Sequence, residues 1–405
     1  MRRESPYPMV PIDEAERIIA AHTPLLGSEE IDSLQADGRV LAEDVLAPAD
    51  LPDLPKAAVD GYALRAADGL GARRVLAELT AGPARHVTVE AGTAVRIMTG
   101  APVPTGADAV IMVEQTEETD GVLRITRVLR AGESIHVVGQ DLARGALVLA
   151  RGSVLGPAEI GLLATIGRTR IHAYRRPIVG VLATGDEVFE PDALPPEGGI
   201  RDSNRYALLA AVRAAGCVGL SLGIARDDHA TQRAAILDGL AQADLLLTSG
   251  GVSMGTRDLI KPLLAELGTV HFGRVFFKPG KPTTFATIGE KLAFGLPGYP
   301  VSSLVSFEVF VRPTLRRMQG DNRPNRPLAR VTLPAPLQAS PDRPEYQRAI
   351  VRIDGGRLVA EITGAQGSSR MLSLRDANAL VIVPPREGSY AAGDTLDALL
   401  TGPLV

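Results

Sequence analysis

The sequence predicts a multidomain α/β protein in which a parallel-sheet α/β domain is combined with two β-rich regions. Apolar runs alternate with helical patterns between residues 177 and 320, and such alternation is typical of βαβ units. Residues 48–140 are rich in Pro, Gly and short β-prone runs, which predict a small β-rich domain. After Pro324, apolar and polar residues alternate around turns, which predicts a C-terminal β domain.

The composition argues against several functional classes. The formal net charge is −4, whereas a nucleic-acid-binding surface is usually basic. No stretch approaches ~18 uninterrupted apolar residues, so no membrane span is expected. The N-terminus MRRESPYPMVP lacks the apolar core of a signal peptide, and Cys217 is the only cysteine, so a cytoplasmic location is expected. The six histidines are scattered, which argues against a His-based zinc site.

The expected elements follow in chain order. Residues 11–22 have helical periodicity, residues 28–47 are extended and irregular, and residues 141–172 form a linker with a small helix. In the α/β region, strands are expected at 177–185, 217–225, 243–250 and 269–280, a hairpin at 285–298, and helices at 203–215, 229–242, 257–268 and 300–318. The last helix has few polar positions, so it is expected to be buried. Asp354, Gly355 and Gly356 predict a hairpin turn in the C-terminal domain.

Unusual loops follow each expected strand of the α/β region. These polar or glycine-rich loops are residues 184–187, 226–228, 249–253, 278–282 and 296–300. In a parallel sheet, all of them leave from the carboxyl edge, where open α/β sheets bind ligands. The sequence therefore predicts one crevice on which five loops converge.

The loop SGGVS at residues 249–253 suits a phosphate group. Gly250 and Gly251 allow positive φ angles and close backbone approach to a ligand. A helix expected to start near Asp258 would offer free N–H groups to an anion. An ordinary strand-to-helix turn explains the glycines equally well, so the loop alone leaves both interpretations open.

Carboxylates gather in the same loops. Asp186, Glu187, Asp227, Asp228 and Asp258 carry the oxygen ligands that Mg²⁺ prefers. Helix capping is the alternative for Asp258 and for either Asp227 or Asp228, because these acids precede expected helices. Since the acids come from three loops at one sheet edge, a metal site is the preferred hypothesis.

Only five of the 43 basic residues are lysines, and two of the five, Lys278 and Lys281, lie in one short loop. Two ammonium groups suit a dianion such as phosphate or another tetrahedral oxyanion. A solvated loop is the alternative, but the scarcity of lysine argues against it. Ser302 and Ser303 add hydroxyls just after Pro300, where ordinary helix-start chemistry is the alternative.

Ten short motifs occur along the chain in the order VDGYA, IMTGAPVP, GQD, TGDE, RDD, SGGVS, KPGKP, LPGYPVS, YQR and QGS. In these motifs and their order, over essentially its whole length, the chain resembles the molybdopterin molybdenumtransferase family, the MoeA proteins and gephyrin E domains. Several are weak individually, but ten in order are specific. Composition alone gives Asp60, Thr99 and Asp141 no function, whereas the resemblance implies that they act on the partner protomer's site.

The resemblance implies four domains and a homodimer. The domains would be a molybdopterin-binding α/β domain (1–20 and 177–322), a linker domain (21–47 and 142–176), an inserted β-rich domain (48–141) and a β-barrel-like C-terminal domain (323–405). In the family, the active cleft lies between the α/β domain of one protomer and the β-rich domain of the other.

The implied activity is the insertion of molybdate into adenylylated molybdopterin, with Mg²⁺-dependent release of AMP. Adenylylated molybdopterin and molybdate would be the substrates and Mg²⁺ the cofactor. The resemblance also implies transient contacts with the molybdopterin adenylyltransferase and with apo-molybdoenzymes. Neither a nucleic acid nor a membrane is expected as a partner.

Matching motifs imply the roles of individual residues. The catalytic acids would be Asp60, Asp141, Asp186, Asp227 and Asp258, and the metal ligands Asp186, Glu187, Asp227 and Asp258. Substrate binding would involve Thr99, Thr184, Gly185, Glu187, Ser249, Gly250, Gly251, Ser253, Pro297, Gly298 and Pro300. Molybdate would bind to Lys278, Lys281, Ser302, Arg348 and Ser368.

The chain departs from the family's usual pattern at Pro55, Val59 and Tyr299, which leaves molybdate and tungstate open as the oxyanion. A non-catalytic, gephyrin-like scaffold is a further alternative, but the intact acids and lysines favour catalysis. A nucleotide-hydrolysing protein that shares only the α/β domain would lack KPGKP, the DGYA domain and the C-terminal β domain. This chain has all three.

Overall fold

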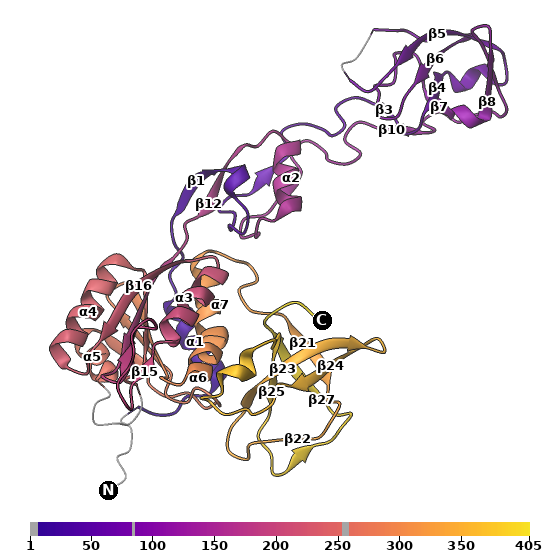
Figure 1. The fold of residues 1–405 in the computed structure, drawn as a ribbon. Coiled ribbons are helices and arrows are strands. Elements are labelled where there is room, and N and C mark those ends of the chain that lie inside the picture. Colours follow the sequence, from indigo (N-terminus) through magenta and orange to yellow (C-terminus); the bar gives the residue numbers. More distant parts are fainter. Residues whose placement is uncertain (1–6, 83–85, 253–258) are drawn as a thin grey trace. The chain divides into compact units, whose positions relative to one another are not determined.

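The computed structural model describes residues 7–82, 86–252 and 259–405 (Figure 1). The chain divides into two compact units. Unit 1 comprises Met1–Ala42, Gly152–Gly156 and Arg170–Val405, and unit 2 comprises Glu43–Arg151 and Pro157–Thr169. Unit 1 contains the expected α/β region and the C-terminal β domain, and unit 2 contains the expected β-rich region.

Unit 1 is built on a six-stranded sheet with the order β16-β13-β17-β20-β19-β18. Its strands are β13 (Ile178–Thr184), β16 (Val218–Ala225), β17 (Leu245–Ser249), β18 (Thr269–Phe272), β19 (Thr284–Ile288) and β20 (Lys291–Leu296). The first four strands in the order are parallel, and β19 is antiparallel to both of its neighbours. Because β19 runs opposite to β20, residues 278–282, which precede β19, lie at the same edge as the loops that follow β13, β16, β17 and β20. The described residues of the five predicted loops therefore lie at the carboxyl edge.

Helices cover both faces of this sheet. One face packs against α1 (Ile12–His22), α3 (Asn204–Ala214), α6 (Pro300–Ser306), η4 (Phe307–Val311) and α7 (Arg312–Met318). The other face packs against α4 (His229–Gln242) and α5 (Ile260–Leu267). Side chains alternate between the faces, since Val181 and Leu247 join the first core whereas Leu182 and Leu246 join the second. The predicted buried helix at 300–318 is confirmed, with a π-helical segment, η4, in its middle.

Two details of the α/β region differ from the predictions. The expected strand at 269–280 is wrong in extent, because β18 ends at Phe272. Val275 forms a bridge with Val10 instead, and the N–H of Phe276 donates to the Val10 carbonyl. The helix expected near Asp258 begins at Ile260, and residues 253–258 lie outside the described part of the chain.

The C-terminal part of unit 1 is a closed five-stranded barrel with the order β21-β24-β23-β25-β27, which confirms the predicted barrel-like fold. The strands are β21 (Leu328–Thr332), β23 (Glu345–Asp354), β24 (Arg357–Ile362), β25 (Ala379–Val383) and β27 (Thr395–Leu400). The predicted hairpin joins β23 to β24, and Gly355 and Gly356 have φ angles of 55° and 75°. Tyr346 and Leu380 extend from the barrel into the α/β core, so the two domains pack together.

Unit 2 contains a six-stranded sheet with the order β7-β4-β6-β5-β9-β8. Its strands are β4 (Gly61–Leu64), β5 (Arg73–Leu79), β6 (Thr93–Ile97), β7 (Ala109–Met112), β8 (Thr116–Thr119) and β9 (Val122–Ile125). Two short ribbons pair β2 (Val45–Leu46) with β11 (Leu147–Leu149) and β3 (Lys56–Ala57) with β10 (Ile135–His136). The small helix expected in the linker is α2 (Pro157–Thr165).

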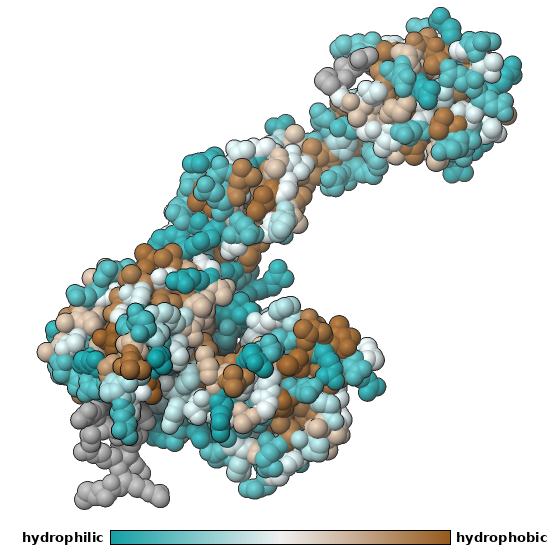
Figure 2. All heavy atoms as spheres, in the orientation of Figure 1, coloured by the Kyte–Doolittle hydropathy of each residue, from teal (hydrophilic) through white to brown (hydrophobic). Residues whose placement is uncertain are grey.

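Shorter elements complete the chain. They are β1 (Ser28–Asp32) paired with β12 (Arg170–Tyr174), β14 (Val188–Phe189) paired with β15 (Ile200–Arg201), β22 (Leu337–Gln338) paired with β26 (Ser389–Tyr390), and the 3-10 helices η1 (Ser33–Gln35), η2 (Ala66–Asp68), η3 (Val113–Gln115) and η5 (Met371–Leu374). Figure 2 shows apolar side chains interspersed with polar ones on the visible face of each unit. In the described ranges, no helix has the length and apolar character that a membrane crossing requires.

Candidate functional site

Asn204 links two of the predicted loops at the carboxyl edge of the unit 1 sheet. Its side-chain amide donates to Ser249 Oγ and to the Gly298 carbonyl oxygen, each at 2.7 Å. The loop that carries Pro297, Gly298 and Pro300 is thereby held against the loop that follows β17. Sequence reasoning missed Asn204, because an Asn in the first turn of a helix is commonplace. Its position directly after the loop 184–203 was the available signal.

The glycines after β17 are required by close packing within the protein. Gly250 has a φ of 97°, and a Cβ there would lie 2.7 Å from the Thr184 carbonyl oxygen. Gly251 has a φ of 63°, and its Cβ would lie 2.9 Å from Ile260 Cγ1. The N–H of Gly250 already donates to the Leu296 carbonyl. The two glycines therefore bring three loops into contact, and Ser253 in the same loop lies outside the described residues.

Two predicted acids lie side by side at this edge. The N–H of Asp227 donates to Asp186 Oδ1 at 3.1 Å, and the N–H of Asp186 donates to Asp227 Oδ2 at 3.4 Å. Glu187 lies against Gly185, where a Cβ would approach Glu187 Oε2 to 2.7 Å. Within the described ranges, no group of three or more His, Cys, Asp or Glu residues is arranged to hold a metal ion. Asp258, the acid expected from a third loop, lies outside those ranges.

The capping alternative applies to Asp228. This residue is the N-cap of α4, and its Oδ1 accepts from the N–H of Thr231 at 2.8 Å. Hydrogen bonds from the hydroxyl and the N–H of Thr231 hold the pKa of the Asp228 carboxyl below its ordinary value. Asp228 therefore caps α4, whereas Asp227 exchanges hydrogen bonds with Asp186.

A second group of predicted residues lies where the α/β domain meets the barrel. Lys278 Nζ pairs with Glu345 Oε1 at 3.4 Å, and the backbone of Lys278 exchanges hydrogen bonds with that of Pro344 and Tyr346. Burial lowers the pKa of Lys281, and the neighbouring charges of Arg274 and Arg343 lower it further. Several cationic groups therefore gather at the start of β23.

Arg348 is fully buried on the same strand. Its Nε donates to Ser373 Oγ at 3.0 Å and its Nη2 to the Gly367 carbonyl at 3.4 Å, whereas Nη1 has no hydrogen-bond partner in the described part of the chain. Burial lowers the pKa of Arg348 to about 10, although the charge of Glu345 opposes that shift. A buried guanidinium with an unpaired N–H group is costly unless an anion binds to it.

The remaining predicted oxyanion ligands are connected to Arg348 through one loop. The Ser368 carbonyl, next to Gly367, accepts from the N–H of Val301 at 3.1 Å. Ser302 follows in the first turn of α6 and is buried. Hydrogen bonds thus connect Arg348 on β23 to the loop of Gly367 and Ser368, and connect that loop to the start of α6. The resulting donor set is cationic and rich in hydroxyls.

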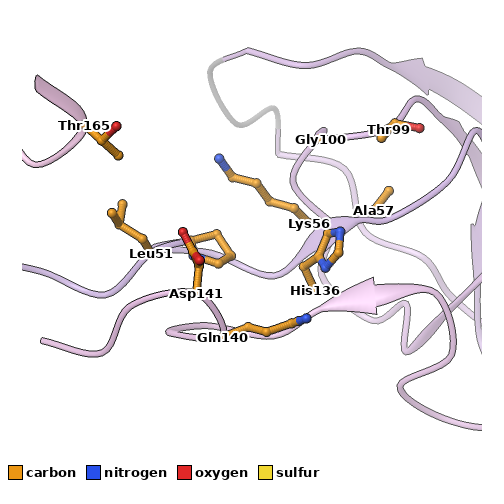
Figure 3. A pocket seen from close by; sticks show the side chains of 10 residues that line it. Leu51, Lys56, Ala57, Thr99, Gly100, His136, Gln140, Asp141 and Thr165 are labelled. Atoms are coloured by element: carbon orange, nitrogen blue, oxygen red, sulfur yellow. The ribbon is translucent and has the colours of Figure 1, made fainter. Parts of the chain in front are cut away.

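Unit 2 holds a separate pocket of about 510 Å³ (Figure 3). Its polar lining includes Thr99 and Asp141, both predicted as site residues, together with Lys56, His136, Gln140 and Thr165. The side chains of Lys56 and Asp141 extend into the same space (Figure 3). Sequence reasoning missed Lys56 and His136, and the rarity of lysine was the signal that could have found Lys56.

Asp60 positions one wall of this pocket. Its Oδ1 accepts from both the N–H and the hydroxyl of Thr99, each at 2.7 Å. The N–H of Thr99 makes the largest contribution to holding the pKa of Asp60 below its ordinary value, and the hydroxyl adds to it. Gly61 follows at the start of β4, where a Cβ would lie 1.7 Å from the Ile111 carbonyl oxygen. The Asp-Gly pair therefore combines a charged anchor with a position that only glycine can occupy.

Comparisons with known proteins agree along the whole chain. The model of the MoeA N-terminal region (domain I and II) matches residues 10–167, that of a probable molybdopterin binding domain matches residues 180–317, and that of the MoeA C-terminal region (domain IV) matches residues 330–401. These three models cover unit 2, the α/β domain and the barrel.

Individual relatives support the same assignment. Gephyrin from Dictyostelium discoideum is 36% identical over 100% of this chain, which spans 64% of the length of that protein. Molybdopterin molybdenumtransferase 2 from Mycobacterium tuberculosis is 37% identical over 95% of this chain and 98% of its own length. The crystal structure of the molybdopterin biosynthesis protein MoeA from Pyrococcus horikoshii OT3 has a TM-score of 0.85 and 28% identity, covering 97% of this chain and 100% of that one.

Proposed function

Because this chain belongs to the molybdopterin molybdenumtransferase family, we propose that it inserts molybdate into adenylylated molybdopterin and releases AMP in a Mg²⁺-dependent step. The chain is an enzyme of molybdenum cofactor biosynthesis. To this biosynthetic role the proposal adds the identity of the substrate, of the metal and of the oxyanion.

The buried Arg348 is the observation that carries the proposal. Its Nη1 has no hydrogen-bond partner among the described residues. The same junction of the α/β domain and the barrel contains Lys278, Ser302 and Ser368. Molybdate is a tetrahedral dianion, and a buried cation with a free N–H group favours such an anion.

The acids at the sheet edge suit Mg²⁺. This ion binds through one or two protein carboxylates together with waters and substrate phosphates, and Asp186 and Asp227 supply two carboxylates from adjoining loops. Glu187 and Asp258 are the further ligands that the family pattern implies. When bound, the metal would polarise the phosphoanhydride as a Lewis acid.

The loops at the same edge would hold the pterin nucleotide. The residues assigned to this role are Thr184, Gly185, Glu187, Ser249, Gly250, Gly251, Ser253, Pro297, Gly298 and Pro300. Asn204 would hold two of these loops together through its two hydrogen bonds. Asp60, Thr99 and Asp141 of unit 2 would complete the site from the partner protomer of a homodimer in the cytoplasm.

AMP release by the purified protein tests the proposal. We expect release only when Mg²⁺ and molybdate are both present, and Asp186→Ala and Lys278→Ala should each abolish it without changing the oligomeric state. Asp238→Ala on α4 and Lys291→Ala are controls of matched charge outside the assigned residues. Undiminished turnover in both Asp186→Ala and Lys278→Ala would remove these residues from the site. Replacing molybdate with tungstate in the same assay decides which oxyanion the enzyme prefers.

A further inference from the structure

We propose that Lys56 and His136 form an anion-binding subsite in the unit 2 pocket, which takes a phosphate group of a phosphorylated heterocycle. The proposal rests on the proposed function in one respect, namely that this heterocycle is the adenylylated pterin. It assigns a binding role to two residues that the family motifs do not include.

The two residues face each other across a two-stranded ribbon. In the antiparallel pair of β3 and β10, His136 lies directly opposite Lys56. Opposed residues of an antiparallel pair project on the same face, with their Cβ atoms ~5 Å apart. An ammonium and an imidazole on the same face of a ribbon can both donate hydrogen bonds to one anion. The ribbon is therefore arranged to receive negative charge.

Lys56 is chemically exceptional in its surroundings. It is the only lysine in the sequence of unit 2. Its side chain is half-buried, and no ion pair or hydrogen bond of its ammonium group is found among the described residues. The carboxylate of Asp141 lines the same pocket. An ordinary surface lysine would be solvated, whereas this one extends into a pocket (Figure 3).

The other walls indicate what else the ligand must carry. Leu51, Pro52 and Ala57 give the pocket an apolar surface on which a flat ring can lie. Asp141 accepts hydrogen bonds, and Gln140 keeps its NH₂ group available because its Oε1 accepts from Val137. A simple inorganic anion would use only the lysine and histidine. A heterocycle with N–H groups and a phosphate would use every wall.

Lysine acetylation detected by mass spectrometry tests the subsite without relying on catalysis. The chain has only five lysines, so the acetylation rate of each can be followed separately in the full-length protein. Inorganic pyrophosphate and AMP serve as probes. We expect either probe, added above its dissociation constant, to slow acetylation of Lys56 by at least about threefold, while Lys291 is unaffected. A Lys56 that reacts at the same rate with and without both probes overturns the subsite.

Kinetics then test whether the substrate uses the subsite. We expect Lys56→Met to raise KM for adenylylated molybdopterin about tenfold with kcat nearly unchanged, and Lys56→Arg to retain a low KM. A wild-type KM in Lys56→Met also overturns the proposal. If the wild-type enzyme released no AMP at all, the proposed function would fail, and the acetylation experiment would still decide whether the subsite binds anions.

Discussion

Gln232 shows how a single side chain ties the fold to the site. The residue is fully buried on α4, and its Nε2 donates to Asp227 Oδ1 at 3.1 Å. Its Oε1 has no hydrogen-bond partner in the described ranges. An unpaired buried amide oxygen costs on the order of 1–3 kcal/mol. The gain that offsets this cost is a fixed orientation for Asp227.

Replacing Gln232 with leucine should therefore change stability and activity in opposite directions. Gln232→Leu removes the unpaired oxygen and should raise the free energy of unfolding by about 1 kcal/mol, measured in urea. It also frees Asp227, so AMP release should fall about tenfold. Gln242→Leu, on the exposed end of the same helix, is the control. A variant that is less stable yet fully active would contradict the assigned role.

Residue types and their order predicted much of the site, whereas the contacts between residues were not predictable. The order of the motifs placed Asp186 and Asp227 in neighbouring loops, and the structure brings them together. Lys56 pairs with His136 although the two are 80 residues apart in the sequence. Each strand of their ribbon is only two residues long, so the sequence contains no periodic pattern from which the pairing could be predicted. The buried state of Arg348 was equally hidden, because a strand Arg is ordinarily exposed.

At the scale of elements, an ion pair joins the beginnings of two central strands. Arg175 donates to both carboxylate oxygens of Asp244 at 2.7 Å, and the N–H of Ile178 donates to Asp244 Oδ2 at 2.9 Å. Burial alone would raise the pKa of Asp244, but these hydrogen bonds outweigh it, and the pKa lies below its ordinary value of 3.8. The charged form is therefore the one that stabilises the fold.

The sign of that pKa shift fixes a pH dependence. Stabilisation from Asp244 is fully present above pH 3.8 and is lost as the pH falls through the lower pKa of the folded state. Asp244→Asn should reduce the free energy of unfolding by on the order of 2 kcal/mol at pH 7. The difference between wild type and variant should shrink below pH 3.8 in urea titrations. A difference that stays constant down to pH 3 would contradict the shift.

Two glycines of unit 2 should respond in opposite ways to substitution by alanine. Gly61→Ala places a Cβ 1.7 Å from a backbone oxygen of β7, so β4 and β7 must separate, and a loss of more than about 3 kcal/mol is expected. Gly161→Ala lies in α2, where no atom is found within 4 Å of the added Cβ, and should stabilise the helix by about 1 kcal/mol. Thermal unfolding measures both. Equal effects would contradict the close approach at Gly61.

Local patterns predicted most elements, and the failures have nonlocal causes. The hairpin at Gly355 and Gly356 and the helix at 300–318 were predictable because turn chemistry and apolar spacing are local signals. The strand at 269–280 was predicted too long, since pairing of Val275 with Val10 depends on a distant segment. Apolar residues alone cannot show which partner such a segment will choose.

At the scale of the whole molecule, the assigned site residues are divided between the two units. Asp60, Thr99 and Asp141 belong to unit 2, whereas Asp227 and Lys278 belong to unit 1. The proposed homodimer would build each site from unit 1 of one protomer and unit 2 of the other. A site shared between two protomers and a site within one protomer predict different results when two inactive variants are mixed.

Mixing two inactive variants should restore activity if the site is shared. Asp141→Asn and Asp227→Asn are each expected to be inactive, but a mixed dimer would contain one doubly altered and one intact site. Random co-assembly should therefore restore about a quarter of the wild-type sites. Co-expression with two affinity tags isolates the mixed dimer for assay. A mixed dimer without activity would place each site within a single protomer.

The most direct measurement of the central claim is the stoichiometry of a single turnover. The enzyme is mixed with limiting adenylylated molybdopterin, and the AMP released and the molybdenum bound to the pterin are quantified together. We predict one AMP for each molybdenum inserted, with neither product formed when molybdate or Mg²⁺ is omitted. AMP released without molybdate, or molybdenum inserted without AMP, would contradict the proposed reaction.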